Sequence, residues 1–298
     1  MENKRYRGML FATVGGIFWG LSGVFGQYLF INNDLNAKWL VSVRLFIAGL
    51  LLLIIVYIKN GNKVFDVIKK KNNWLLLILY SIFGMGLCQF SYYTTVELSN
   101  AGTATVIQYT GPALIILYFC IVYKKKPTLI QILALIMSMT GVAFLATKGD
   151  FTSLSISKEA LFWGIISAIA LAAYNIMPAR LTYHYGTLSI MGWGMFISGI
   201  LLSLYVKPWH VIGHWDTMGF ISLGVVIIVG TILAFSLYME GVKLAGAQTA
   251  SLIASVEPVT ATIATVLLMN ISFTAYELLG IGLILVAVAM LSLKKEDE

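Results

Sequence analysis

Long apolar runs separated by short polar gaps fill this sequence from end to end. A helix needs about 20 mostly apolar residues to cross a bilayer. Hydrophobic residues make up 59% of the chain and charged residues only 11%, whereas a soluble domain carries about 25% charged residues. The sequence therefore predicts an all-α integral membrane protein with ten transmembrane helices. The predicted spans are residues 8–30, 37–58, 73–97, 101–123, 128–147, 159–181, 186–206, 217–239, 246–269 and 274–293.

The gaps between these spans are too short to hold a soluble domain. The longest gaps are residues 59–72, 148–158 and 207–216. The basic start of the chain resembles a signal peptide, but the apolar run that follows is long and has no small-residue cleavage site, which predicts a first transmembrane helix. Function must then lie within the helical bundle or its short loops, and a soluble enzyme domain is excluded.

Lysines and arginines are distributed unevenly over the alternating gaps. With the N-terminus inside, the outer segments hold only four of the 20 basic residues, which are Lys38, Lys148, Lys158 and Lys207. Short cytoplasmic loops carry an excess of these residues. We therefore predict a bacterial inner-membrane protein with both termini cytoplasmic, whose basic face lies against anionic lipid. No nucleic acid is needed to explain the charge.

The chain also repeats part of itself. VELSNAGTATVIQYTGP (96–112) aligns without a gap on VKLAGAQTASLIASVEP (242–258), and seven of the seventeen positions are identical. In the same register, Thr128 falls on Thr274 and Gln131 on Glu277. Five spans per half give the halves opposite orientations, as in the inverted repeats of secondary transporters. The predicted repeats are residues 1–147 and 148–298.

Glu257 and the paired prolines Pro112 and Pro258 lie near the middle of their predicted spans. A proline inside a helix frees a backbone carbonyl and bends the helix, and transporter sites form where helices are interrupted near the midplane. The prolines can equally be packing kinks. A carboxylate at this depth is costly and marks a substrate or ion path. Because apolar surroundings disfavour its charged form, Glu257 is a candidate proton-coupling residue, with a structural glutamate as the alternative.

Arg44 is the only basic residue well inside a predicted span. It can serve as counter-ion of Glu257, as anchor for a substrate carboxylate or as a structural brace, and the sequence leaves these roles open. Other polar and aromatic residues inside the spans complete the candidate substrate path. Tyr238, near a span end, can instead be an interface anchor, and Trp19 either a packing residue or a cavity wall. The full candidate set is Trp19, Ser22, Arg44, Gln89, Tyr93, Gln108, Tyr109, Tyr174, Asn175, Tyr238 and Glu257.

Several of these stretches resemble the drug/metabolite transporter superfamily, EamA type. The resemblance rests on GGIFWGLSG, VSVRLFIAGLLLL, AGTATVIQYTGPALIILYF and AGAQTASLIASVEPVTATIATV, and it covers essentially the whole chain. It is closest to the bacterial branch associated with carboxylates, amino acids and amines. The resemblance implies ten helices as two five-helix inverted repeats, and export or exchange of small metabolites. An acidic residue usual after the fourth helix of each unit is missing from YKKKP and MNISF.

These observations predict a secondary transporter, an exporter or exchanger of a small polar metabolite, working by alternating access as the two five-helix halves rock. Its expected partners are the substrate and the bilayer, as a monomer or homodimer, with no cofactor or metal. A channel or facilitative transporter is the alternative. An intramembrane lipid-modifying enzyme would need a catalytic set, and no aspartate or histidine occurs inside a predicted span.

Overall fold

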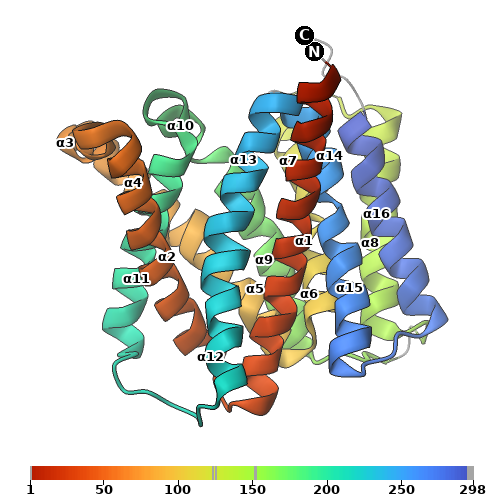
Figure 1. The fold of residues 1–298 in the computed structure, drawn as a ribbon. Helices are drawn as coiled ribbons and strands as arrows, with labels where there is room; N and C mark the ends of the chain where they lie inside the picture. The colour runs from red at the N-terminus through yellow and green to blue at the C-terminus, as the bar shows by residue number, and fades with distance from the viewer. Residues whose placement is uncertain (1, 123, 125, 151–152, 294–298) are drawn as a thin grey trace.

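The computed structural model describes residues 2–122, 124, 126–150 and 153–293, and all regular secondary structure in this part of the chain is helical (Figure 1). Eight helical stretches are long and apolar enough to cross a membrane, and two shorter apolar helices follow at Val256–Met269 and Ala275–Leu291. The prediction of an all-helical membrane protein is confirmed at this level. The exact count of ten spans and their orientation stay predictions.

The helices of the first half run from α1 to α8. They are α1 (Glu2–Asn32), α2 (Ala37–Asn60), η1 (Gly61–Phe65), α3 (Asp66–Lys69), η2 (Lys71–Asn73), α4 (Trp74–Leu79), the π-helix η3 (Tyr80–Gly86), α5 (Leu87–Leu98), α6 (Ala101–Gln108), α7 (Gly111–Val122) and α8 (Leu129–Thr147). The gap expected at 59–72 is thus largely helical, because short 3-10 turns and α3 connect α2 to α4.

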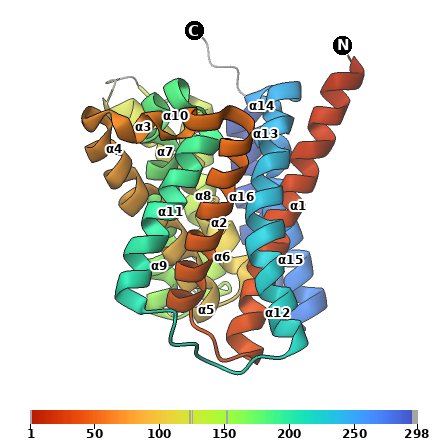
Figure 2. The ribbon, with the colours of Figure 1, turned by 60° about the vertical axis from the view of Figure 1, so that its left-hand side comes forward.

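The second half runs from α9 to α16, and its last helix ends at the same end of the bundle where α1 begins (Figures 1 and 2). The span expected at 159–181 ends early, and α10 forms a separate short helix. The elements are α9 (Lys158–Ile176), α10 (Ala179–Tyr185), α11 (Thr187–Val206), α12 (Thr217–Gly224), the π-helix η4 (Val225–Leu233), α13 (Ala234–Ala245), α14 (Ala247–Ala254), α15 (Val256–Met269) and α16 (Ala275–Leu293).

Two helices break in the middle of their apolar runs, next to the paired prolines. α6 gives way to α7 through a turn at Tyr109 and Thr110, and α14 to α15 at Ser255. Pro112 is the second residue of α7 and Pro258 the third of α15. A proline fits the first helical turn because the backbone N–H that it lacks has no partner there anyway. Each break therefore leaves a helix start within an apolar run.

α2 and α11 pack closely along a reciprocal crossing (Figure 2). A Cβ added at Gly49 would lie 2.4 Å from the backbone nitrogen of Phe196, and one at Gly199 would lie 2.3 Å from that of Phe46. The rings of Phe46 and Phe196 stack on each other, 5.5 Å between centroids. Each glycine lets the other helix approach, as small residues do in membrane bundles.

α8 and α16 form a second reciprocal crossing. A Cβ at Gly141 would meet Ile284 and the carbonyl oxygen of Gly280, and one at Gly280 would meet the carbonyl oxygen of Gly141. Both helices also start with the same hydrogen bond, in which the side chain three residues on accepts from the backbone N–H of a threonine. Thr128 N donates to Gln131 Oε1 at 2.8 Å, and Thr274 N donates to Glu277 Oε2 at 2.7 Å.

α1 packs against helices of the second half, mainly α13 and α15 (Figure 1). α9 does the same toward the first half, where it packs against α5 and α7. Helices of the two predicted repeats therefore pack between one another. The rocking of the two halves that the sequence predicts stays a prediction.

Candidate functional site

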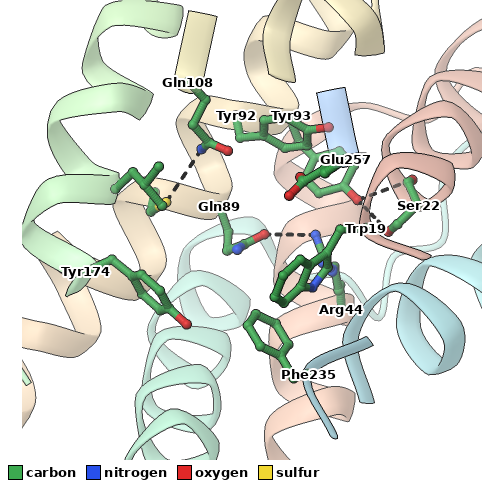
Figure 3. Close-up of a pocket in the computed structure, with 12 residues that line it drawn as sticks. Trp19, Ser22, Arg44, Gln89, Tyr92, Tyr93, Gln108, Tyr174, Phe235 and Glu257 are labelled. Atoms are coloured by element: carbon green, nitrogen blue, oxygen red, sulfur yellow. Dashed lines mark hydrogen bonds between the residues drawn. The ribbon is translucent and has the colours of Figure 1, made fainter. Parts of the chain in front are cut away.

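A small cavity lies where the broken helices meet α1, α2 and α5 (Figure 3). Its volume is about 130 Å³, room for about four water molecules. The lining combines one arginine and one glutamate with amides, hydroxyls and aromatic rings. The lining residues are Trp19, Ser22, Arg44, Cys88, Gln89, Tyr92, Tyr93, Gln108, Leu171, Tyr174, Phe235 and Glu257.

Arg44 is 4% exposed and is held from three sides. Its Nη1 donates to Gln89 Oε1 at 2.8 Å and its Nε donates to Thr231 Oγ1 at 2.9 Å. Its guanidinium carbon lies 4.9 Å from the ring centroid of Tyr93, a cation–π contact. These hydrogen bonds use two of the five N–H donors of a guanidinium group. The group is thus oriented by the protein and retains donors for a ligand.

Thr231 lies in the π-helix η4 and is fully buried. Its hydroxyl donates to Val226 O at 3.0 Å, a carbonyl five residues earlier, while it accepts from Arg44. π-helical turns occur often at functional sites. The wide turn here aims the threonine oxygen at the guanidinium group.

Glu257 faces the same cavity from the first turn of α15 (Figure 3). Its Oε2 accepts a hydrogen bond from the hydroxyl of Tyr109 at 2.9 Å, and that hydroxyl also lies 3.1 Å from Ala254 O. None of the ion pairs found among the described residues joins Glu257 to Arg44. The cavity thus presents a cation and a carboxyl group that a ligand can reach separately.

Aromatic rings form much of the remaining wall. The ring of Trp19 packs edge-on against Phe235, with 4.8 Å between centroids, and in a tilted arrangement against Tyr238 at 5.1 Å. The Trp19 Nε1 is buried and has no hydrogen-bond partner among the described residues. A buried donor without a partner is costly, so this N–H is available to a ligand acceptor. One turn further along α1, Ser22 Oγ lies 3.2 Å from Tyr93 OH.

Eight of the eleven predicted substrate-path residues line this cavity: Trp19, Ser22, Arg44, Gln89, Tyr93, Gln108, Tyr174 and Glu257. Tyr109 and Tyr238 lie behind it, in contact with Glu257 and Trp19 respectively. Asn175 lies outside it, because its side chain is exposed and donates back to Leu171 O at 2.7 Å.

Four lining residues were not among the predicted ones: Cys88, Tyr92, Leu171 and Phe235. Tyr92 shares a helical face with Gln89 and was detectable by spacing. Cys88 accepts a hydrogen bond from Gln108 Nε2 at 3.6 Å. Leu171 and Phe235 carry no polar signal, so the sequence alone does not separate them from packing residues. Among the described residues, no group of three or more His, Cys, Asp or Glu side chains could hold a metal ion.

Two long segments of the chain, residues 6–147 and 158–293, match the model of the EamA-like transporter family. The chain belongs to this family. It is 38% identical over 290 residues to the uncharacterized inner membrane transporter YicL of Salmonella typhimurium, covering 96% of this chain and 95% of that protein. It is 22% identical over 233 residues to the threonine/homoserine exporter RhtA of Escherichia coli, covering 76% and 75%.

A solved crystal structure matches the fold with a TM-score of 0.65 and 15% identity, covering 96% of each chain. At this identity the likeness concerns the fold alone. The family and the two relatives define the protein as a membrane transporter of the EamA group. The residues that line the cavity bear on which molecule the protein carries and on how transport is driven.

Proposed function

We propose that this protein is a secondary active transporter that exports or exchanges a small polar metabolite, an amino acid, an amine or a carboxylate, by alternating access. The carrying observation is the pairing of Arg44 and Glu257 in one small cavity without a direct ion pair between them. A guanidinium group binds carboxylates well, and a carboxyl group next to aromatic faces suits an ammonium group.

The proposed architecture is ten spans in two inverted repeats, residues 1–147 and 148–298, with both termini in the cytoplasm of a bacterial cell. The reciprocal α2–α11 crossing supports it, since a two-fold axis that relates α2 to α11 would relate Gly49 to Gly199. The matching hydrogen bonds at Gln131 and Glu277 support it as well. Because the repeats interleave, we expect mixed groups of helices from both repeats to move during transport.

Glu257 is the proposed proton-exchanging group. It is the only acidic side chain among the described residues that line the cavity. Its carboxyl group has one tyrosine hydroxyl as a hydrogen-bond partner and faces a space that can hold water or substrate. Substrate and proton can therefore compete for the same oxygen atoms, which is a physical basis for exchange.

The 22% identity to an exporter of threonine and homoserine favours an amino acid among the three substrate classes. A cavity of about 130 Å³ suits such a small molecule better than a nucleotide or a peptide. This support is weaker than that from the cavity, because transporters of one fold carry different substrates.

The test is counterflow in proteoliposomes with a panel of amino acids, amines and carboxylates under an imposed pH gradient. Wild type is compared with Glu257→Gln, and Glu240→Gln is the matched control. Glu240 lies outside the cavity, where its carboxylate pairs with Lys243 at 3.3 Å. We expect Glu257→Gln to lose the response to the pH gradient and the control to keep it.

Equal pH-driven flux in wild type and Glu257→Gln would make Glu257 structural. Flux without counterflow would favour the channel or facilitative reading over exchange. Absence of flux for every compound, from protein that remains folded, would contradict the proposed substrate classes.

A further inference from the structure

A second cavity, of about 370 Å³, lies between η3–α5 and α11, away from the central one. Its lining is almost wholly apolar, and several lining side chains are exposed, among them Ile82, Phe83 and Leu201. We call it the α5–α11 groove. Its lining residues are Ser81, Ile82, Phe83, Gly86, Leu87, Phe90, Ser198, Leu201, Leu202 and Tyr205.

The two serine hydroxyls of the groove are already occupied. Ser81 Oγ donates to Leu77 O at 2.7 Å, and Ser198 Oγ donates to Gly194 O at 2.6 Å and also contacts Ser81 O. The contact of Ser198 Oγ with Ser81 O joins η3 to α11. Apart from the Tyr205 hydroxyl at its end, the groove therefore presents hydrocarbon along its length, so the part of the occupant that lies in it must be apolar.

Both walls belong to stretches long and apolar enough to cross a membrane, Lys71–Leu98 and Thr187–Val206. The exposed side of the groove therefore faces the hydrocarbon of the bilayer. A water molecule takes about 30 Å³ and a methylene group about as much, so the groove has room for about a dozen methylene groups. That is the length of one acyl chain within a single leaflet.

The groove runs from the middle of α11 to its last turn, where the chemistry changes. Tyr205 is 76% exposed at this end, and Trp209 is 61% exposed. Lys207 follows the helix directly and is exposed. Aromatic rings of this kind lie at the headgroup level of membranes, and lysine attracts lipid phosphates.

We propose that the α5–α11 groove is a binding site for a phospholipid, with one acyl chain between η3–α5 and α11 and the phosphate beside Lys207. The apolar lining, the volume and the basic end fit one molecule of this class. The proposal goes beyond the transport function and does not depend on the substrate of the central cavity.

The experiment uses the full chain in vesicles of phosphatidylethanolamine and phosphatidylglycerol. A phosphatidylglycerol with a diazirine in its acyl chain is activated by light, and the labelled peptides are identified by mass spectrometry. We expect adducts to concentrate on residues 81–90 and 198–205. Leu201→Trp fills the groove and should abolish these adducts. Leu204→Trp is the matched control, because Leu204 is 65% exposed on the same helix and does not line the groove.

Ile82→Trp fills the groove from the opposite wall and replaces Leu201→Trp if that variant does not fold. Lys207→Gln should lower the yield of adducts from phosphatidylglycerol. Labelling spread over all exposed helices and unchanged by Leu201→Trp would mean ordinary boundary lipid and would overturn the proposal. Disulfide formation between two copies of a Leu201→Cys variant would also overturn it, since a second chain would then cover the groove.

Discussion

The two proposed repeats place a charge and a glycine at corresponding positions, and the charge belongs to the first repeat at one such pair and to the second repeat at the other. At the α2–α11 crossing, Arg44 precedes Gly49 by five residues and Gly194 precedes Gly199 by five, so Gly194 is the counterpart of Arg44. At the helix breaks, Gly111 precedes Pro112 as Glu257 precedes Pro258. Each half therefore contributes one charge to the central cavity and one glycine elsewhere.

The glycine positions are packed by neighbouring side chains. A Cβ at Gly194 would lie 2.6 Å from the ring of Tyr80, and one at Gly111 would lie 2.9 Å from Leu171 Cδ2. Tyr80 is 1% exposed. Similar helix geometry thus holds a cavity in one place and a packed contact in the corresponding place. The comparison teaches that two similar repeats can form one site instead of two when each charged residue of one repeat corresponds to a glycine in the other.

The largest effect should come from Arg44→Lys, which keeps the charge and removes the planar group. The variant loses the bonds to Gln89 and Thr231, and hydrogen bonds to a charged group contribute about 1.5–3 kcal/mol each. We expect substrate counterflow to fall to background while the protein stays folded but less stable. Counterflow and SDS titration measure the two effects. Full flux in Arg44→Lys would contradict this prediction, because it would mean that only the positive charge at this position is needed.

A smaller effect is expected when alanine replaces the two glycine counterparts. Overpacking costs about 1–3 kcal/mol, and Gly194→Ala should cost more than Gly111→Ala, because a buried ring yields less than the end of a leucine. Gly224→Ala is the control, since nothing lies within 4 Å of its added Cβ. SDS titration gives the free energies of unfolding. Lost pH-driven flux with unchanged stability in Gly111→Ala would mean that the first break is also a site.

α2 and α11 can also be compared by removing one tryptophan hydrogen bond from each helix. Trp39 Nε1 donates to Pro208 O at 3.1 Å, and Trp193 Nε1 donates to Val64 O at 2.8 Å. Each bond joins one helix to the segment that directly follows the other helix. We expect Trp39→Phe and Trp193→Phe each to cost about 1 kcal/mol in unfolding free energy, as single hydrogen bonds do. A large loss of unfolding free energy in only one of the two variants would show that the two hydrogen bonds are not equivalent.

The smallest effect concerns Asp216, in the loop before α12. Hydrogen bonds from Gly219 N–H and from Asn33 hold the pKa of this carboxyl below its ordinary value. A lowered pKa in the folded state means that the carboxylate stabilises the loop at neutral pH and that this stabilisation is lost as the pH falls through the folded-state pKa. The protection factor of the Gly219 amide, which is its intrinsic exchange rate divided by the observed rate, should therefore fall in acid, and Asp216→Asn should remove that pH dependence. Identical pH profiles for both proteins would contradict this.

The apolar runs were enough to predict the long helices, because membrane helices require unbroken hydrophobic length. The charged and amide residues of the cavity were also predictable. Arg44, Glu257 and Gln89 cost free energy inside a bilayer, so their presence in a span indicates a functional site. Phe235 and Leu171 were not predictable, because an apolar residue in a span gives the same sequence pattern whether it lines a cavity or packs in the core. The π-helices and the glycine crossings depend on contacts between distant segments, which no local pattern reports. Asn175 is a predicted path residue that lies outside the cavity and bonds to its own helix, and its role stays a prediction.

The hydrogen bonds of Arg44 have a consequence for biosynthesis. The chain is made from its N-terminus, so α2 is inserted long before α15 and its carboxyl group exist. Gln89 and Tyr93, which bind the guanidinium group, follow in α5 of the same half. Thr231 is added later. A nascent first half can thus shelter its buried cation with partners of its own, and the ribosome can reach Glu257 without an unpaired arginine in the bilayer.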